Sequence, residues 1–269
     1  MLDARRLVGT HHILLMTLDT LRFDVAQSVL RAGRTPVLQR LLPNGEWQRR
    51  HTPGNFTWAA HHAFFAGFLP TPATPGPHPR LFAARFHGSE TTTEKTYLFD
   101  APDLMTGLRQ AGYHTICIGG VGFFNKQTAL GRVFPDMFDE SHWSPEMGVT
   151  NVDSPRHQFD AAREAIERTS GQKLFLFVNV SAMHQPNCHY LPGASSDGPE
   201  SQGEALAYVD SCLPPLLRTM QAAGPWMCVV CSDHGTAYGE AGHVGHRCGH
   251  EVVWTVPYSE FLLPAESSA

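Results

Sequence analysis

Two segments at opposite ends of this chain carry residue types that bind metal ions, and each follows an apolar run. Asp233 and His234 follow the apolar run 226–230, and Asp19 follows the apolar run 13–16. Apolar runs of this length, bounded by polar residues, predict buried strands. Ligands of parallel α/β sheets bind outside the carboxyl ends of the strands, so both segments are expected at one edge. The pattern predicts a hydrolytic metal site.

Thr57 is the candidate nucleophile, because it opens a helix predicted over 57–65 and ended by Gly67. The N–H groups and positive dipole end of a helix stabilise the anionic oxygens of a phosphoryl or sulfuryl group. A threonine hydroxyl needs activation at neutral pH, and a divalent metal can supply it. The same position also allows Thr57 to serve only as a helix N-cap.

Several of the sixteen histidines lie in places that favour site chemistry. His184 follows the apolar run 174–180, which places it at the same edge of the sheet, although a solvated loop histidine is the alternative. His243, His246 and His250 lie in a glycine-rich stretch and are candidates for another ligand or an acid. His246 and His250 would share one face if that stretch were helical.

Two acidic residues near these motifs are expected to be structural. Asp24 has an arginine close by in the chain, and we expect it to pair with that arginine or with a backbone amide rather than with a metal. Glu240 lies among glycines, where a loop or capping role is expected rather than a role as general base.

Composition and charge exclude several classes of protein. Hydrophobic residues make up 42% and charged residues 17%, which is typical of a globular chain. The length fits one α/β domain over residues 1–269. The net charge of −5 gives no reason to expect nucleic acid as a partner. Neither a secretory leader nor an apolar run of about 20 residues is evident, so we expect no membrane partner.

The six cysteines predict a reducing, cytoplasmic location rather than a disulfide framework. Several lie in or beside apolar runs, where a free cysteine behaves as a small hydrophobic residue. Cys228 and Cys231 lie three residues apart in a predicted strand and therefore point to opposite faces. We expect no redox or zinc pair there.

The rest of the chain alternates helices and strands, which predicts an α/β fold with a mainly parallel central sheet sandwiched by helices. Asp19-Thr20 is expected to cap a helix reaching Leu30, and Thr35-Pro36 to open another reaching Leu42. Pro214-Pro215 should break or restart a helix over 203–223. Further helices are predicted over 103–111 and 157–169, and strands over 115–118, 174–180 and 256–263. Residues 70–80 are predicted to form an irregular loop, and the sequence allows no assignment for residues 120–156.

The motifs resemble, in order and spacing, the sulfatase and phosphonate monoester hydrolase branch of the alkaline phosphatase superfamily. The segments at 15–24 and 35–41 resemble its Leu-x-x-x-Asp-Thr-Leu-Arg-x-Asp and Thr-Pro-x-Leu-x-x-Leu patterns. Residues 63–70 look like its Ala-Leu-Leu-Thr-Gly-x-x-Pro, and counting back ten positions from Gly67 places Thr57 on the family's nucleophile. Other matches are Gly-Tyr-x-Thr at 112–115, His-x-Pro at 184–186, Val-Pro at 256–257, and the Asp-His-Gly block at 233–246, with His246 where a lysine is usual.

This resemblance implies an alkaline phosphatase-like fold and one divalent ion: Mn, Zn, Ca or Mg. The chain is shorter than is usual for the family, so we expect the fold to lack the usual C-terminal subdomain. The ligands that it implies are Asp19, Thr57, Asp233 and His234. The implied reaction is attack by Thr57 on a small-molecule ester, with the Trp58 backbone N–H and the metal stabilising the developing charge. His184 would protonate the leaving oxygen or bind a substrate oxygen, and His246 would contact a non-bridging oxygen. A homo-oligomer is left open.

The chain departs from the family at two places. Residues 57–61 read Thr-Trp-Ala-Ala-His and lack the Cys/Ser-x-Pro-x-Arg pattern that sulfatases convert to formylglycine. We therefore expect an unmodified threonine and a phosphate or phosphonate ester as substrate. The family's Gly-Lys-Trp-His is replaced by Gly-Gly-Val-Gly at 119–122.

Four alternatives remain open: a sulfate ester hydrolase, a phosphoglycerol-type transferase, a two-metal phosphodiesterase and a catalytically degraded binding protein. The two-metal class is disfavoured because residues 180–184 offer no aspartate.

Overall fold

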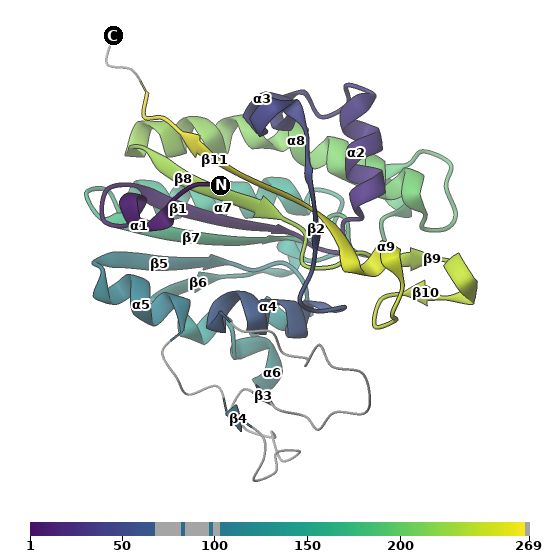
Figure 1. Ribbon diagram of the computed structural model, residues 1–269, viewed down its shortest axis with the longest axis horizontal. Helices are drawn as coiled ribbons and strands as arrows, with labels where there is room; N and C mark the ends of the chain where they lie inside the picture. Colours follow the sequence, from purple (N-terminus) through teal and green to yellow (C-terminus); the bar gives the residue numbers. More distant parts are fainter. Residues whose placement is uncertain (68–81, 84–96, 99–102, 267–269) are drawn as a thin grey trace.

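The computed structural model describes residues 1–67, 82–83, 97–98 and 103–266. The predicted loop at 70–80 and the end of the 63–70 motif lie outside these ranges. A seven-stranded sheet forms the centre of the fold, in the order β2-β11-β8-β1-β7-β5-β6 (Figure 1). Its strands are β1 (His12–Leu18), β2 (Gln48–His51), β5 (Tyr113–Ile118), β6 (Glu140–His142), β7 (Lys173–Val180), β8 (Trp226–Cys231) and β11 (Thr255–Leu263).

The five strands from β8 to β6 pair in parallel, whereas β11 runs antiparallel to β8 and β2 runs antiparallel to β11. The predicted α/β class with a mainly parallel sheet is therefore confirmed. Two small strand pairs lie outside the sheet: β3 (Phe82–Ala83) with β4 (Tyr97–Leu98), and β9 (Ala237–Tyr238) with β10 (Val244–Gly245).

Helices cover both faces of the sheet (Figure 1). One face carries α2 (Phe23–Arg31), α3 (Pro36–Leu41), α7 (Ser154–Arg168) and α8 (Pro199–Ala223). The other face carries α4 (Thr57–Ala66), α5 (Leu104–Gln110) and α6 (Ala129–Arg132). The remaining α-helices of the described ranges are α1 (Ala4–Leu7) and α9 (Glu251–Trp254). Within those ranges, no helix combines the length and the apolar character that a membrane span needs.

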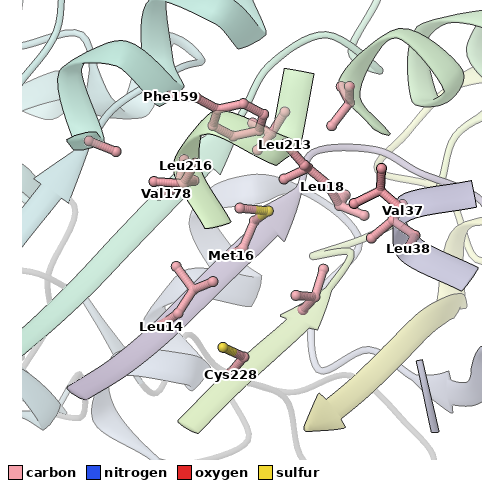
Figure 2. Packing of buried hydrophobic residues seen from close by; sticks show 14 of the residues in the cluster. Leu14, Met16, Leu18, Val37, Leu38, Phe159, Val178, Leu213, Leu216 and Cys228 are labelled. Atoms are coloured by element: carbon pink, nitrogen blue, oxygen red, sulfur yellow. The ribbon is translucent and has the colours of Figure 1, made fainter. Parts of the chain in front are cut away.

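Alternating side chains of the central strands divide the core into two layers. Leu14, Met16 and Leu18 of β1 pack toward α8 and α3, as Figure 2 shows. In β7, Phe175 and Phe177 belong to the opposite layer, beneath α4 and α5. Because side chains alternate along a strand, the polar residues Thr17 and Asn179 fall on the α4 side.

Two predicted helices differ from the observed ones. The helix at 203–223 is α8, which begins at Pro199 and continues through Pro214 and Pro215 without a break, so the predicted interruption is wrong. Its fully buried side chains pack on the sheet, and this packing outweighs the lost backbone bonds. α2 begins at Phe23, not after an Asp19-Thr20 cap, because Asp19 is used elsewhere.

The segment 120–156, which the sequence left unassigned, contains α6, β6 and three short 3-10 turns. These elements are only three or four residues long, and the segment is rich in glycine and proline, so hydrophobic periodicity could not predict them.

The start of α3 is capped from another helix. Thr35 occupies the N-cap position as predicted, but its side chain makes no capping bond. Instead, the carboxylate of Asp210 on α8 accepts the N–H groups of Val37 at 3.1 Å and Leu38 at 2.7 Å. α8 therefore fixes α3 through a buried, charged cap.

Replacing Asp210 with alanine should lower the free energy of unfolding by about 1–3 kcal/mol, because two buried N–H groups lose their acceptor. Urea unfolding followed by circular dichroism measures the change. Thr35→Val is the matched control and should change stability by less than about 0.5 kcal/mol. A larger loss in Thr35→Val than in Asp210→Ala would make Thr35 the cap.

Candidate functional site

The four predicted metal ligands meet at one buried point. One ligand atom from each of Asp19, Asp233 and His234 lies within 4.8 Å of the others, and all three residues are fully buried. The Thr57 hydroxyl lies 3.2 Å from Nε2 of His234 and 3.5 Å from Oδ2 of Asp19. The structure thus brings together residues from both ends of the chain.

The sheet topology explains this convergence. Asp19 follows β1 and Asp233 follows β8, and these strands are parallel neighbours, so their carboxyl ends lie side by side. Thr57 is the first residue of α4, whereas Phe56 occupies the N-cap position. The N-cap alternative for Thr57 is therefore wrong, and its hydroxyl lies against Asp19 and His234 instead.

Each carboxylate has one oxygen held by the protein and one that is not. Oδ2 of Asp19 accepts the side-chain amide of Asn179 at 3.0 Å. Oδ1 of Asp233 accepts the N–H groups of Thr20 at 3.2 Å and His234 at 3.0 Å. Across the described ranges, the buried atoms Asp19 Oδ1 and Asp233 Oδ2 find no hydrogen-bond partner. Buried oxygens of this kind are the expected sign of an ion that belongs there.

Burial and mutual repulsion make two adjacent carboxylates costly. Burial, followed by the nearby charge of Asp233, raises the pKa of Asp19 to about 6. Burial raises the pKa of Asp233 to about 7. A divalent cation between them would remove this penalty, because it offers both carboxylates a positive partner.

His234 is held in the tautomer that a metal ligand needs. Its Nδ1 lies 2.9 Å from the carbonyl of Gly235, which can only accept, so Nδ1 carries the proton and Nε2 keeps its lone pair. A Cβ at Gly235 would lie 1.8 Å from the carbonyl oxygen of Val252, so only glycine fits after the histidine. Two carboxylates, a neutral imidazole and a hydroxyl suit a divalent cation, and the structure therefore contains a candidate Asp/His metal site.

Below the ligands lies a polar network that the sequence analysis missed. Nδ2 of Asn179 donates to Oγ1 of Thr17 at 3.2 Å as well as to Asp19, and Oγ1 of Thr17 lies 3.2 Å from Nε2 of His61. Nδ1 of His61 lies 2.8 Å from the carbonyl oxygen of Thr57. The sequence did contain a signal for this network, because a polar residue lies near the end of each of two apolar strands. These residues, Thr17 and Asn179, are register partners in the sheet.

The glycines at 119–122 serve this network. Oδ1 of Asn179 accepts the N–H of Val121 at 3.0 Å. A Cβ at Gly120 would lie only 2.2 Å from the carbonyl oxygen of Asn179. The segment that replaces the family's Gly-Lys-Trp-His therefore packs its backbone on the strand that orients Asp19.

His184 and His246 lie beside the ligands, as predicted. The ring of His246 is 4.7 Å from that of His234 and 5.8 Å from that of His184. Nδ1 of His184 donates to the carbonyl of Gln185 at 2.6 Å, which leaves Nε2 for a substrate. Burial and the two neighbouring imidazoles lower the pKa of His246 to about 3, so it is neutral at pH 7.

The other two candidate histidines, His243 and His250, have no contact with the proposed ligands among the interactions of the described residues. The stretch from His243 to His250 is not helical, so the proposed shared helix face of His246 and His250 is wrong. His250 is the N-cap of α9, where its Nδ1 accepts the N–H of Val252 at 3.3 Å. His243 is exposed.

Asp24 and Glu240 have the structural roles expected of them. The buried guanidinium of Arg22 donates to Oδ2 of Asp24 at 2.6 Å and to Oε1 of Glu240 at 2.5 Å. Oε2 of Glu240 also accepts the N–H of Tyr238 at 2.6 Å. Arg22 thereby ties the start of α2 to the loop after β9.

Solved structures share this fold at low sequence identity. The C-terminal periplasmic domain of phosphoethanolamine transferase EptC from Campylobacter jejuni matches with a TM-score of 0.60 and 13% identity, over 94% of this chain and 80% of that one. Lipoteichoic acid synthase LtaP from Listeria monocytogenes matches with a TM-score of 0.60 and 13% identity, over 97% and 67%. An alkaline phosphatase superfamily protein from Vibrio parahaemolyticus matches with a TM-score of 0.58 and 17% identity, over 95% and 60%.

A comparison with the curated proteins gave no match. The family model for sulfatases, in contrast, matches residues 12–258, which include every residue of the candidate site. The fold, the motif order and this match agree: the chain belongs to the sulfatase family.

Proposed function

We propose that the chain hydrolyses phosphate or phosphonate esters of small molecules, with Thr57 as nucleophile and one divalent ion at the Asp19, Asp233 and His234 site. The observation that carries this proposal is the place of the Thr57 hydroxyl. It stands at the N-terminus of a ten-residue helix, within 3.5 Å of a ligand carboxylate and 3.2 Å of a ligand imidazole. The neighbouring Asp19 carboxylate also keeps a buried oxygen, Oδ1, that has no hydrogen-bond partner across the described ranges, so an ion bound there would lie beside the Thr57 hydroxyl.

The roles of the residues follow from their positions. When bound, the ion supplies positive charge that favours the deprotonated hydroxyl of Thr57. Thr57 Oγ1 then attacks phosphorus, the ester oxygen leaves, and water later cleaves the phosphothreonine to regenerate the hydroxyl. The N-terminus of α4, with the Trp58 N–H, faces the developing negative charge. His184 in its doubly protonated form would give the Nε2 proton to the leaving oxygen and would take a proton back from the water that cleaves the phosphothreonine, and neutral His246 would donate a hydrogen bond to a non-bridging oxygen.

A transferase is the second candidate, because two of the structures with this fold are a phosphoethanolamine transferase and a lipoteichoic acid synthase. In that case an alcohol, rather than water, would take the group from Thr57. Product analysis in the presence of added glycerol separates the two, since a transferase forms a new ester and a hydrolase releases the acid.

Removing the metal should destabilise the wild-type protein in a pH-dependent way. The raised pKa values of Asp19 and Asp233 mean that folding takes up protons, so the stability of the chelated protein falls as pH rises from about 4 to about 7. A divalent ion at about 100 times its Kd should raise Tm by about 5 °C or more at the higher pH. Differential scanning fluorimetry with and without EDTA measures both effects.

Asp233→Asn provides the control for this measurement. The amide removes one of the two charges, so the chelated variant should be at least as stable as the chelated wild type at pH 8, yet gain little from added metal. Equal metal-induced stabilisation of both proteins would place the ion elsewhere.

Thr57→Ala should lower kcat by about 10⁴-fold or more, because the covalent route is lost, while the metal still stabilises the fold. Thr57→Ser keeps a hydroxyl and should retain measurable turnover. A colorimetric assay with aryl phosphate mono- and diesters, phosphonates and sulfates tests both variants. Turnover of Thr57→Ala near the wild-type rate would exclude the nucleophile, and faster turnover of sulfates would overturn the substrate class.

His184→Ala should steepen the dependence of rate on the pKa of the leaving group. An acid helps a poor leaving group far more than a nitrophenolate, which departs unaided. A series of aryl esters, measured as kcat/KM for wild type and variant, gives the two slopes. Equal losses along the series would assign His184 to substrate binding instead.

A further inference from the structure

We propose that His61 is a positioning residue, which ties the backbone of the nucleophile Thr57 to the strand residues that orient the metal ligand Asp19. This inference rests on the proposed function and adds to it a residue that touches neither substrate nor ion. The case depends on the surroundings of His61, on its hydrogen bonds and on what those bonds connect.

The surroundings of His61 are almost entirely aromatic. The side chain is fully buried in α4. Five phenylalanine rings surround it with centroid distances of 5.0–6.2 Å, namely Phe64, Phe65, Phe124, Phe134 and Phe177. A sixth apolar ring would fit such a cage without the cost of burying two polar nitrogens. Stability alone therefore gives no reason for an imidazole here.

Both nitrogens of His61 are nevertheless used. Nδ1 lies 2.8 Å from the carbonyl oxygen of Thr57, which can only accept, so Nδ1 carries the proton. Nε2 is then an acceptor, and the hydroxyl of Thr17 donates to it at 3.2 Å. With Nδ1 donating and Nε2 accepting, the ring is neutral. A neutral ring supplies a donor and an acceptor without a charge that would repel a divalent cation nearby.

The two bonds connect the nucleophile to a ligand. Thr17 gives its proton to His61, and its oxygen accepts Nδ2 of Asn179 at 3.2 Å. The same amide nitrogen donates to Oδ2 of Asp19 at 3.0 Å. A continuous chain of hydrogen bonds therefore runs from the carbonyl of Thr57 to the carboxylate of Asp19, and from α4 to the sheet.

His61 also faces the second carboxylate. Its Nδ1 lies 3.7 Å from Oδ2 of Asp233, the buried oxygen that has no hydrogen-bond partner among the residues the structure describes. The N–H edge of the imidazole thus gives a weak dipolar contact to that oxygen and leaves it available to an ion. One side chain acts on the positions of three of the four proposed ligands.

His12 provides a matched control on the same strand. It lies at the opposite end of β1, and it is also a buried histidine with both nitrogens bonded to backbone groups. Its Nε2 lies 3.1 Å from the carbonyl of Ala223, its Nδ1 accepts the N–H of Leu174 at 3.1 Å, and its ring stacks on Trp226. These contacts serve stability alone, because nothing of the proposed site lies there.

The experiment compares His61→Phe with His12→Phe in the full chain. Three quantities are measured: the Tm in EDTA, the Kd of whichever of Mn²⁺, Zn²⁺, Ca²⁺ or Mg²⁺ stabilises the wild type most, and kcat with an aryl phosphodiester. His61→Phe removes the acceptor of the buried Thr17 hydroxyl but fills the aromatic cage, so its Tm should fall by less than that of His12→Phe, while ion affinity and kcat fall by about 10–100-fold each. His12→Phe should lower Tm and leave both ion affinity and kcat within about twofold of wild type.

Partial rescue tests the bond to the nucleophile. Asparagine can place an amide N–H close to the position of Nδ1, so His61→Asn should recover part of the ion affinity and kcat lost in His61→Phe, even though the smaller side chain lowers Tm. No recovery in a folded His61→Asn protein would overturn the role assigned to the Thr57 contact.

Two further results would overturn the inference. Wild-type ion affinity and kcat in His61→Phe would make the imidazole dispensable, and a fall in Tm as large as that of His12→Phe would make it structural. Failure of the proposed function looks different, because the wild type itself would then bind no ion or show no turnover that depends on Thr57.

Discussion

The proximity of two buried carboxylates is the constraint on which the rest of the site depends. Asp19 and Asp233 are both fully buried, and burial raises the pKa of each. Folding without a counter-charge must either protonate them or tolerate their repulsion. The protein offsets only half of this cost, since each carboxylate has one oxygen bonded to protein groups and one without a hydrogen-bond partner across the described ranges. This incomplete solvation leaves both oxygens available to the ion of the proposed metal site.

Holding these groups together requires backbone geometry that is unfavourable in isolation. Thr20 adopts a φ of 60°, a left-handed conformation that costs a β-branched residue about 1–3 kcal/mol. That conformation directs the Thr20 N–H to Asp233 and the Thr20 hydroxyl to the carbonyl of Met183. Gly235 and Gly120 permit approaches that any Cβ would block. The strain and the close approaches cluster around the carboxylates, and the two packed core layers stabilise the fold enough to maintain them.

The sequence indicated the proposed ligands but not the hydrogen-bond network that orients them. Asp19 and Asp233-His234 were predictable because they end apolar runs, and the end of a parallel strand has a fixed place in the fold. Thr17, Asn179 and His61 were not, because a polar residue inside an apolar pattern becomes informative only once register and the facing helix are known. The interruption of α8 was wrongly predicted for the same reason, since local proline chemistry was outweighed by tertiary packing. The α3 cap was missed because Asp210 is remote in sequence.

The proposed nucleophile lies on a helix and the proposed ligands follow strands, and apolar packing alone fixes their relative position imperfectly. The aromatic rings beneath α4 hold the helix against the sheet. Apolar contacts are non-directional, so a small slide of the helix along the sheet changes their packing energy little. In-line attack tolerates much less, because a misplacement of about 1 Å can cost 10²-fold in rate. Hydrogen bonds depend steeply on distance and angle. A single chain of hydrogen bonds from α4 to β1 and β7 can therefore fix the position of the helix along the sheet, which the aromatic contacts do not fix. Among the polar groups that the core retains, Thr17, Asn179 and His61 join the helix to the strands at the site.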